Sequence, residues 1–579
     1  EAEDAHGYNT AIGFEALKTL NAGADAYNTA VGFQAARLMS TGVNNTIVGA
    51  LAGDALTTGV RNTAIGLGAL STEDTGSRNV AVGWYALVNQ DYDGTAYNTA
   101  VGYNAGGAVS TGIQNTVLGG LAGDALTTGS DNVAIGYYSM SADDAGGRSV
   151  AVGSHALTNQ NGGSLHVYNI GIGYNAGASI TNATQNTIIG GLAGDALTEG
   201  SNNTALGYGA LGSEDTSSYA VAIGHNALAT QNAPSDTYNV AVGKSAGYAI
   251  TTGTTNTLIG GQAGDALTTS GANVAVGYQA LSTEDTTGGV TAIGYQALKT
   301  QNASSTSYNV AVGYQAAKEV TTGVGNSIVG GAAADALTTG SYNVAMGSFA
   351  LSVEDTGSRS IAIGYAALEN QNNDDDNYNV AVGHNAGKMI STGTHNSIVG
   401  GLAGDAFTTG DRNVAIGYSA LTSEDTGSRS TAVGYFALAD QNNDSTNYNT
   451  ALGYAAGENI SSGVFNTVLG ALAGDAITGG TNNVVIGYNS AVATNGSNQI
   501  VIGSNAQAVN GSNGITLGDS NITYFQCQVQ TITALSDERD KTNIEDSQYG
   551  LNIIENLKPV KFEWDQRDGN RKGLKDVGF

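Results

Sequence analysis

The side chains in this sequence that could do chemistry are oxygen-bearing residues in long polar loops. The clearest case is the run Asp374, Asp375 and Asp376 in the segment NQNNDDDNYNVAVG, followed by Tyr378 and Asn379. Adjacent carboxylates are the hard oxygen ligands that a calcium ion prefers, so these aspartates are candidate metal ligands. Asn, Asp and Tyr on a protruding turn could instead contact sugars. The simplest alternative is that loops tolerate Asn and Asp, which hydrogen-bond to the nearby backbone.

Loops of this kind recur along the chain. Two further examples are NQDYDGTAYNTAVG at 89–102 and DQNNDSTNYNTALG at 440–453, and each carries a Tyr-Asn pair such as Tyr97-Asn98. With coils stacked at the strand spacing, equivalent loops lie on the order of 19 Å apart. One chain therefore cannot pool residues from two such loops into one site.

No enzyme site is predicted in the body of the chain. Six histidines stand singly, and none recurs at a fixed place in the repeat: His6, His155, His166, His225, His384 and His395. Cys527 is the single cysteine, which excludes an intrachain disulfide framework and a cysteine-based zinc site. We expect no cofactor. A paired-carboxylate glycosidase site between subunits stays open, because the sequence does not determine interchain distances.

Composition and charge limit the class of protein. The chain has 85 Gly, 2 Pro and 12% charged residues, which favours a regular β architecture. The net charge is −29, with 12 basic and 39 acidic residues up to Leu535, so nucleic acid is not an expected partner. No run of 18 apolar residues occurs, so no membrane insertion is expected. The chain opens at Glu1 without a Met, and we expect the true N-terminus to lie upstream.

Internal repeats predict the fold. The pattern N-[TV]-[AVI]-[VIL]-G recurs with 30 closing glycines between Gly13 and Gly518, mostly 17 residues apart. Four short repeats form a unit of about 70 residues. An aspartate in AGDAL or a variant of it marks each unit, at Asp54, Asp124, Asp195, Asp265, Asp335, Asp405 and Asp475.

Each short repeat predicts one coil of a parallel β-solenoid. It holds a strand such as NTAIG, a bend at glycine, a second short segment such as LGAL and a polar connection. Thr63 and Ile65 should point to one side of the strand and Ala64 and Gly66 to the other. Stacked coils cover one side and a neighbouring chain could cover the other, so we expect a homo-oligomer. The alternative is a monomeric solenoid with a thin core.

Two recurring polar features are interpreted structurally. Asparagines at equivalent coil positions should form a ladder in which stacked amides hydrogen-bond to one another. Members of this ladder include Asn62, Asn79, Asn98 and Asn115. In the turn STEDTGSR, Glu73, Asp74 and Arg78 are interpreted as a solvated acidic edge with a local ion pair.

The chain changes character near residue 520. We predict a solenoid body over 1–520, a connecting β segment over 521–535 and a small α+β segment over 536–579. In the last segment, a helix should begin near Asp546 and end before Pro559, and VKFEW should form a strand.

The body resembles a known family of fibres. Its NTAIG and NVAVG repeats are similar to the repeats in the head domains of trimeric autotransporter adhesins. This resemblance implies a left-handed parallel β-roll that assembles as a homotrimer.

The charged end resembles the C-terminal intramolecular chaperone of endosialidases and phage tail fibres, the peptidase S74 family. The matching residues are Ser536, Asp537, Arg539, Lys541, Asn543, Ile544, Leu557, Pro559, Val560, Phe562 and Trp564. The resemblance implies a segment that registers the chains of a trimeric β-fibre and continues past Phe579. It also implies self-cleavage at Leu535–Ser536, with Ser536 as nucleophile and Lys541 as base.

That chemistry is reasonable, because a serine hydroxyl needs a nearby base and a lysine with a lowered pKa can serve as one. The alternative is that Ser536 begins a turn and Lys541 pairs with nearby carboxylates.

These observations together predict an all-β, homotrimeric tail fibre located in the virion. Its expected partners are a host glycan or protein receptor and, through a part upstream of this sequence, other tail proteins. Self-cleavage would be its only chemistry. The alternatives are an adhesin on a cell surface and a fibre that degrades polysaccharide.

Overall fold

The computed structural model describes residues 7–163, 166–508, 511–526 and 528, and two strands at 560–563 and 575–578. The chain divides into two compact units, Glu1–Asp519 and Ser520–Phe579. In the described residues there is no helix long and apolar enough to cross a membrane.

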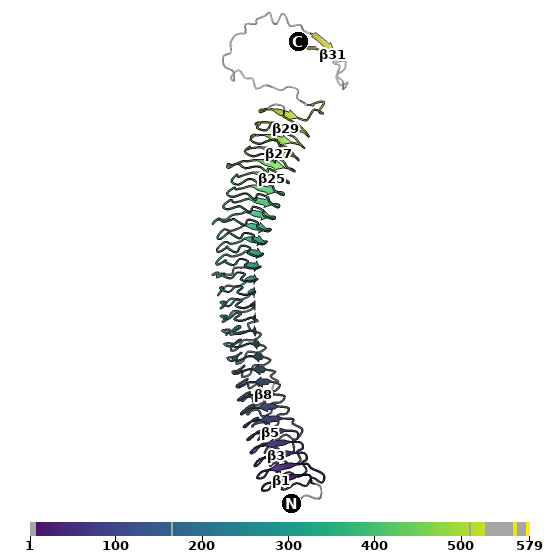
Figure 1. Ribbon diagram of the computed structural model, residues 1–579, viewed down its shortest axis with the longest axis vertical. Coiled ribbons are helices and arrows are strands. Elements are labelled where there is room, and N and C mark those ends of the chain that lie inside the picture. The colour runs from purple at the N-terminus through teal and green to yellow at the C-terminus, as the bar shows by residue number, and fades with distance from the viewer. Residues whose placement is uncertain are drawn as a thin grey trace. The chain divides into compact units, whose positions relative to one another are not determined.

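The first unit is a parallel β-solenoid of 30 coils, which confirms the predicted all-β fold (Figure 1). Every coil contributes one strand of three residues. The strands are β1 (Thr10–Ile12), β2 (Thr29–Val31), β3 (Thr46–Val48), β4 (Thr63–Ile65), β5 (Val80–Val82), β6 (Thr99–Val101), β7 (Thr116–Leu118), β8 (Val133–Ile135), β9 (Val150–Val152), β10 (Ile170–Ile172), β11 (Thr187–Ile189), β12 (Thr204–Leu206), β13 (Val221–Ile223), β14 (Val240–Val242), β15 (Thr257–Ile259), β16 (Val274–Val276), β17 (Thr291–Ile293), β18 (Val310–Val312), β19 (Ser327–Val329), β20 (Val344–Met346), β21 (Ile361–Ile363), β22 (Val380–Val382), β23 (Ser397–Val399), β24 (Val414–Ile416), β25 (Thr431–Val433), β26 (Thr450–Leu452), β27 (Thr467–Leu469), β28 (Val484–Ile486), β29 (Ile500–Ile502) and β30 (Ile515–Leu517).

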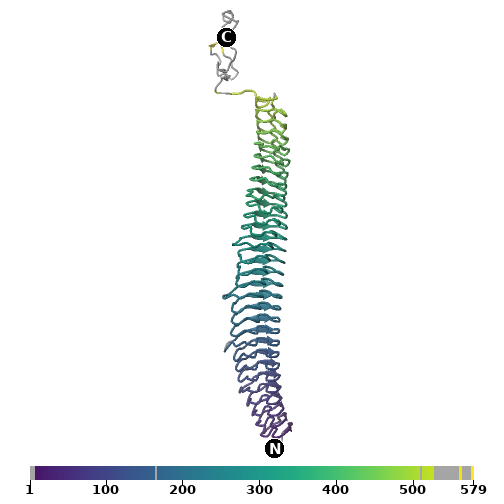
Figure 2. The ribbon, with the colours of Figure 1, turned by 90° about the vertical axis from the view of Figure 1, so that its left-hand side faces the viewer.

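Each strand pairs in parallel with the strand of the coil before it and the coil after it. In the pair β4–β5, Thr63 lies opposite Val80, Ala64 opposite Ala81 and Ile65 opposite Val82. Equivalent residues of successive coils are therefore superposed along the stack, as Figure 2 shows for the strands of the body.

The closing glycine of each strand is required by a close approach between coils. Gly119 has a φ of 139°, where residues with a side chain rarely occur, and a Cβ added there would lie 2.6 Å from the carbonyl oxygen of Gly136. Other glycines in this column, such as Gly294 and Gly313, meet the same limit. This column of glycines explains why the repeat always ends in Gly.

The core is a thin column of small side chains. The central residue of each strand points inward, as Ala64 does with no exposed surface, while Ile65 next to it is 37% exposed. Leucines from the turn, such as Leu70 and Leu87, fill the rest of the interior. The predicted alternation of the strand is confirmed.

The asparagine ladder is present, but its hydrogen bonds differ from those predicted. The backbone N–H of Asn62 donates to Oδ1 of Asn45 at 2.8 Å, and Nδ2 of Asn62 donates to the carbonyl of Gly76 at 2.8 Å. Hydrogen bonds between two side-chain amides are a minority. In most coils the Nδ2 group of the ladder asparagine donates to a backbone carbonyl oxygen, as Asn45 does to Gly59 and Asn115 does to Gly129. Asn62 thus joins two segments of backbone, whereas a few ladder members, such as Asn98 with Gln90, also bond to a side-chain amide.

The second side of each coil is a series of turns with left-handed corners. In the coil after Gly83, Tyr85, Leu87 and Tyr97 have φ angles of 59°, 49° and 55°. Left-handed backbone is unfavourable for residues other than Gly, Asn and Asp. Stacking offsets this strain: the N–H of Tyr85 donates to Leu67 O at 3.0 Å, and that of Leu87 to Ala105 O at 3.1 Å.

The second unit contains an antiparallel pair, β31 (Val560–Glu563) and β32 (Lys575–Gly578). The predicted strand VKFEW is therefore confirmed over 560–563. The predicted helix from Asp546, together with Ser536 and Lys541, lies outside the described residues. The predicted strand is wrong for 521–526, which have no strand structure. An alternating pattern provides no partner strand, and strands are stable only when paired.

Candidate functional site

The acidic loop at Asp374, Asp375 and Asp376 lies exposed on the surface of the body. Oδ1 of Asp374 accepts a hydrogen bond from the Thr356 hydroxyl at 2.8 Å, and Asp376 forms an ion pair with Arg359. The two carboxylates therefore contact different neighbours. In the described part of the chain, a group of three acidic side chains with oxygens within 4.8 Å of one another occurs elsewhere, at Glu73, Asp74 and Asp91.

The Tyr-Asn pairs beside these loops divide between surface and interior. Tyr378 is 48% exposed, whereas Asn379 is fully buried. Oδ1 of Asn379 accepts the N–H of Asn396 at 2.9 Å, and its Nδ2 donates to Gly393 O at 2.7 Å. Of the pair proposed for sugar contact, only the tyrosine is available at the surface.

A buried carboxylate lies beneath the long loop. Oε1 of Glu424 accepts the N–H of Gly427 at 2.7 Å. Its Oε2 accepts two hydrogen bonds, one from Nε2 of Gln441 at 2.8 Å and one from Nδ2 of Asn447 at 2.9 Å. Oε1 of Gln441 in turn accepts a hydrogen bond of 2.8 Å from Nδ2 of Asn449, which is a member of the asparagine ladder. The carboxylate thereby joins its own turn to the base of the loop in the next coil.

This buried acid recurs once in each of the first six of the seven 70-residue units. The acids are Glu73, Asp143, Glu214, Glu284, Glu354 and Glu424, and all are fully buried. In the last five, a glutamine 17 residues later donates to the carboxylate. This spacing of 17 residues, one coil, was the sequence signal that could have revealed the contact.

The interpretation of STEDTGSR as a solvated acidic edge is wrong for Glu73. This side chain has no exposed surface, because its Oε1 accepts the N–H of Gly76 at 2.6 Å inside the turn. Arg78 does not pair with it. The guanidinium of Arg78 donates to the hydroxyl of Tyr97 and lies over its ring, 5.3 Å from the centroid.

Burial alters the acidity of Glu73, Asp143 and Glu424. The pKa of Glu73 is raised to about 7, chiefly by loss of solvation and also by the nearby carboxylates of Asp91 and Asp74, while the N–H groups of Gly76 and Tyr92 oppose the shift. Burial also raises the pKa of Asp143 and Glu424. Burial likewise raises the pKa of four aspartates of the AGDAL turns, Asp54, Asp124, Asp195 and Asp335, and raises the pKa of Asp265 to about 6.

The turn around Glu73 is expected to become less stable as the pH rises. Because the folded chain binds this proton more tightly than the unfolded chain, the stabilisation is complete below the ordinary glutamate pKa of 4.5 and is lost as the pH rises through about 7. Hydrogen exchange of a peptide over 72–79, corrected for intrinsic rates, should show less protection at pH 8 than at pH 5.

Glu73→Gln should remove that pH dependence, since the amide does not titrate. The turn at 56–61 in the preceding coil, which has no acid, is the internal control. Equal protection of 72–79 at both pH values in the wild-type chain would contradict the prediction.

A second surface feature was not foreseen from the sequence, and we call it the planar column. It consists of the residue just before the ladder position in every coil. Six of the seven arginines in residues 1–535 occupy it: Arg61, Arg78, Arg148, Arg359, Arg412 and Arg429. One unbroken stretch comprises Tyr342, Arg359, Tyr378, His395, Arg412, Arg429, Tyr448 and Phe465. The sequence signal that was missed is the type of residue before each ladder position, which is Asn in most coils and Ser after Arg148, Arg359 and Arg429.

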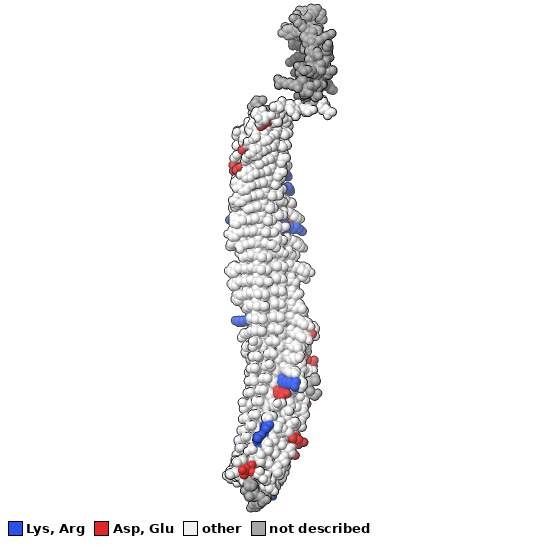
Figure 3. Space-filling view, turned by 90° about the vertical axis from the view of Figure 1, so that its right-hand side faces the viewer, with Lys and Arg blue, Asp and Glu red and all other residues white. Residues whose placement is uncertain are grey.

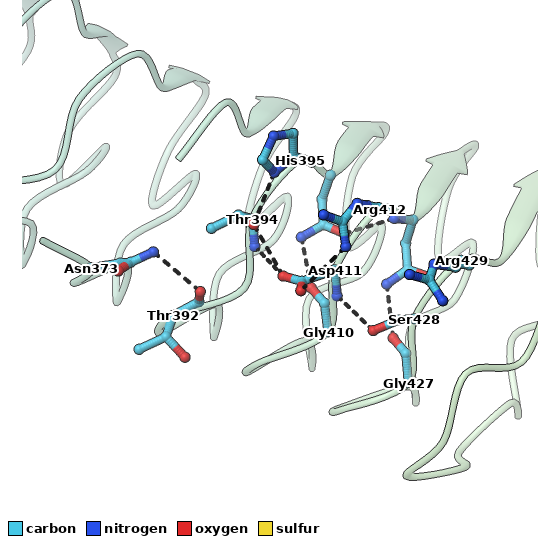
Figure 4. Close-up of polar contacts among 12 residues, drawn as sticks. Asn373, Thr392, Thr394, His395, Gly410, Asp411, Arg412, Gly427, Ser428 and Arg429 are labelled. Carbon is cyan, nitrogen blue, oxygen red and sulfur yellow. Dashed lines mark hydrogen bonds and ion pairs between the residues drawn. The ribbon is translucent and has the colours of Figure 1, made fainter. Parts of the chain in front are cut away.

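Neighbours in the planar column stack on one another. The Arg359 guanidinium lies 5.7 Å from the centroid of Tyr378, whose ring is 5.2 Å from that of His395. Figure 4 shows His395, Arg412 and Arg429 on successive coils. Arg412 has Asp411 beside it at 3.9 Å. Because acidic neighbours accompany its arginines, the column is a mixed aromatic and polar stack rather than a free cationic patch.

A body of 30 stacked coils, with one long loop per four coils and a separate C-terminal unit, defines a fibre-like protein. Residues 536–579 match the Peptidase_S74 family, described as the chaperone of endosialidase, which confirms the resemblance at this end. No curated protein matches the chain. Ser536 and Lys541 fall within the matched residues, and their catalytic roles stay predictions.

Proposed function

We propose that this chain is the host-contacting fibre of a phage tail, a homotrimer whose S74 segment assists assembly. The observation that carries the proposal is the combination of an S74 chaperone match at 536–579 with a 30-coil solenoid body. Chaperone domains of this family are associated with trimeric fibres.

The body explains why such a fibre needs an assembly aid. Successive strands have nearly the same sequence, for example VAV in both β14 and β16. If one chain shifted by one coil relative to its neighbours, each apolar strand would be replaced by a nearly identical one, and little packing would be lost locally. Long parallel pairing is also prone to misassembly during folding. A separate domain that aligns the chains before the coils stack would suppress that error.

The surface supports a role in host contact. Exposed tyrosines such as Tyr97, Tyr378 and Tyr448 recur beside the long loops. Tyrosines of successive long loops lie on the order of 19 Å apart, so the fibre would offer the same weak receptor contact many times along its length. Linked weak contacts yield a strong overall attachment. The receptor would be a surface glycan or protein, and the fibre would reside in the virion, joined to other tail proteins.

The test is binding of the fluorescently labelled full chain to a panel of intact bacterial strains. We expect binding to a subset of strains. Loss of binding after periodate treatment of the cells would assign a glycan receptor, and loss after protease treatment a protein. A matched pair of variants locates the contact: Tyr378→Ala should weaken binding several-fold, whereas Tyr342→Ala, an exposed tyrosine at the equivalent position of a coil that no long loop enters, should not.

Other outcomes would favour the two alternatives. Binding confined to animal or plant cells would support a cellular adhesin and contradict the tail-fibre proposal. Release of new reducing ends from a bound polysaccharide would support a polysaccharide-degrading fibre.

A further inference from the structure

One face of the solenoid is uncharged and largely apolar along its whole length, and we call it the outer strand face. It consists of the first and third residues of β1–β30. The third residue is Val, Ile, Leu or Met in every strand, and the first is Thr, Val, Ser or Ile. No strand of the body contains a charged residue, although the body up to Leu535 has 39 acidic residues.

This face is open to solvent in the single chain. The first and third residues are not buried in any of the 30 strands, whereas the central residue is buried in β2–β29. Leu118, Val399 and Leu469, for example, are all more than one third exposed. Figure 3 shows a side of the body on which Lys, Arg, Asp and Glu are sparse.

The size of the face exceeds what a soluble monomer normally exposes. Thirty strands about 4.8 Å apart, each about 10 Å long, present roughly 1,400 Å² of flat area. The largest apolar patch on a typical monomer is about 300–600 Å². A stable interface buries about 800 Å² on each partner. The face is therefore large enough for a stable association.

Aromatic residues follow the carboxyl end of this face. Tyr278, Tyr295 and Tyr314 each come directly after a closing glycine, and their rings stack 5.7 Å and 5.3 Å apart. Tyrosine is enriched at protein interfaces.

We propose that the outer strand face is the surface by which copies of this chain pack against one another along the fibre. The occupant is a second copy, because the face repeats at the coil spacing over 30 rungs. Only a partner with the same spacing matches it rung for rung, and an identical chain has that spacing. This inference rests on the proposed homotrimer and assigns its interface.

The first test places charges on the face. The double variant Val399→Asp/Ile416→Asp is compared with Val353→Asp, which changes a valine of equal exposure, 42% against 40% for Val399, in a turn outside the strands. Sedimentation of the full chain should show the double variant with at least a tenfold weaker association, and the Val353→Asp variant unchanged. Unaltered far-ultraviolet circular dichroism would show that the coils persist.

The second test is cross-linking, which does not depend on destabilising the assembly. In a Cys527→Ser background, Val399→Cys should give covalent oligomers with a short bis-maleimide, and Val353→Cys should give none. An oligomeric chain whose Val399→Cys variant does not cross-link, or whose double Asp variant stays fully associated, would overturn the assigned face alone. A monomeric wild-type chain would instead overturn the trimer on which the inference rests.

Discussion

The full chain with Ser536→Ala is expected to remain intact, whereas the wild-type chain is expected to yield a body that ends at Leu535. Ser536 lies at the first position of the S74 match, where the resemblance places the nucleophile. Removal of the hydroxyl removes the attacking oxygen, so cleavage should be lost completely. Intact mass under denaturing conditions measures both products directly.

The controls separate chemistry from folding. Ser547→Ala changes another serine of the same segment and should be cut normally. Lys541→Met should also block cleavage, because the serine would lose its base. Sedimentation of the uncut Ser536→Ala chain should still show an oligomer. An uncut wild-type chain would mean that the segment is a retained cap, and the cleavage mechanism would be abandoned.

Gly119→Ala is expected to destabilise the solenoid locally by on the order of 3–5 kcal/mol. The added Cβ would lie 2.6 Å from the oxygen and 2.7 Å from the carbon of the Gly136 carbonyl, at a φ of 139°. Backbone on the next coil cannot move aside without breaking the parallel ladder. Because stability in a repeat protein is largely a sum of neighbour contacts, the loss should be confined to nearby coils.

The adjacent residue is a matched control. A Cβ at Gly120 would meet only a Tyr137 ring carbon at 3.8 Å, and alanine already occupies the equivalent position at Ala50 and Ala471. Limited proteolysis should therefore cut near residues 117–136 in Gly119→Ala and leave Gly120→Ala resistant. Equal resistance of the two variants would show that the glycine column is not needed for the close approach.

Much of the fold could be predicted from the repeat alone. A strand of three or four residues followed by glycine, repeated every 17 residues, predicts stacked parallel coils. The alternation of Thr63, Ala64 and Ile65 predicts two opposite sides of the strand but not which of them faces inward, because both sides are small or apolar. The candidate site was harder to predict from the sequence than the fold. The loops were found from their composition, but the buried acids beneath them were interpreted as solvated, because acidic residues in turns usually face water.

The sequence by itself therefore determined the coil, its register and the alternation of side chains along the strand, since each depends on the order of residues within one repeat. Only the tertiary structure decided the contacts between coils. The left-handed corners at Tyr85 and Leu87 and the burial of Glu73 run against local preference. Each is held by a hydrogen bond to a neighbouring coil: the N–H of Tyr85 donates to Leu67 O, and the N–H of Tyr92 donates to Oε2 of Glu73. Partners on adjacent coils are one full repeat apart in sequence, and their distance is defined only when the coils have stacked.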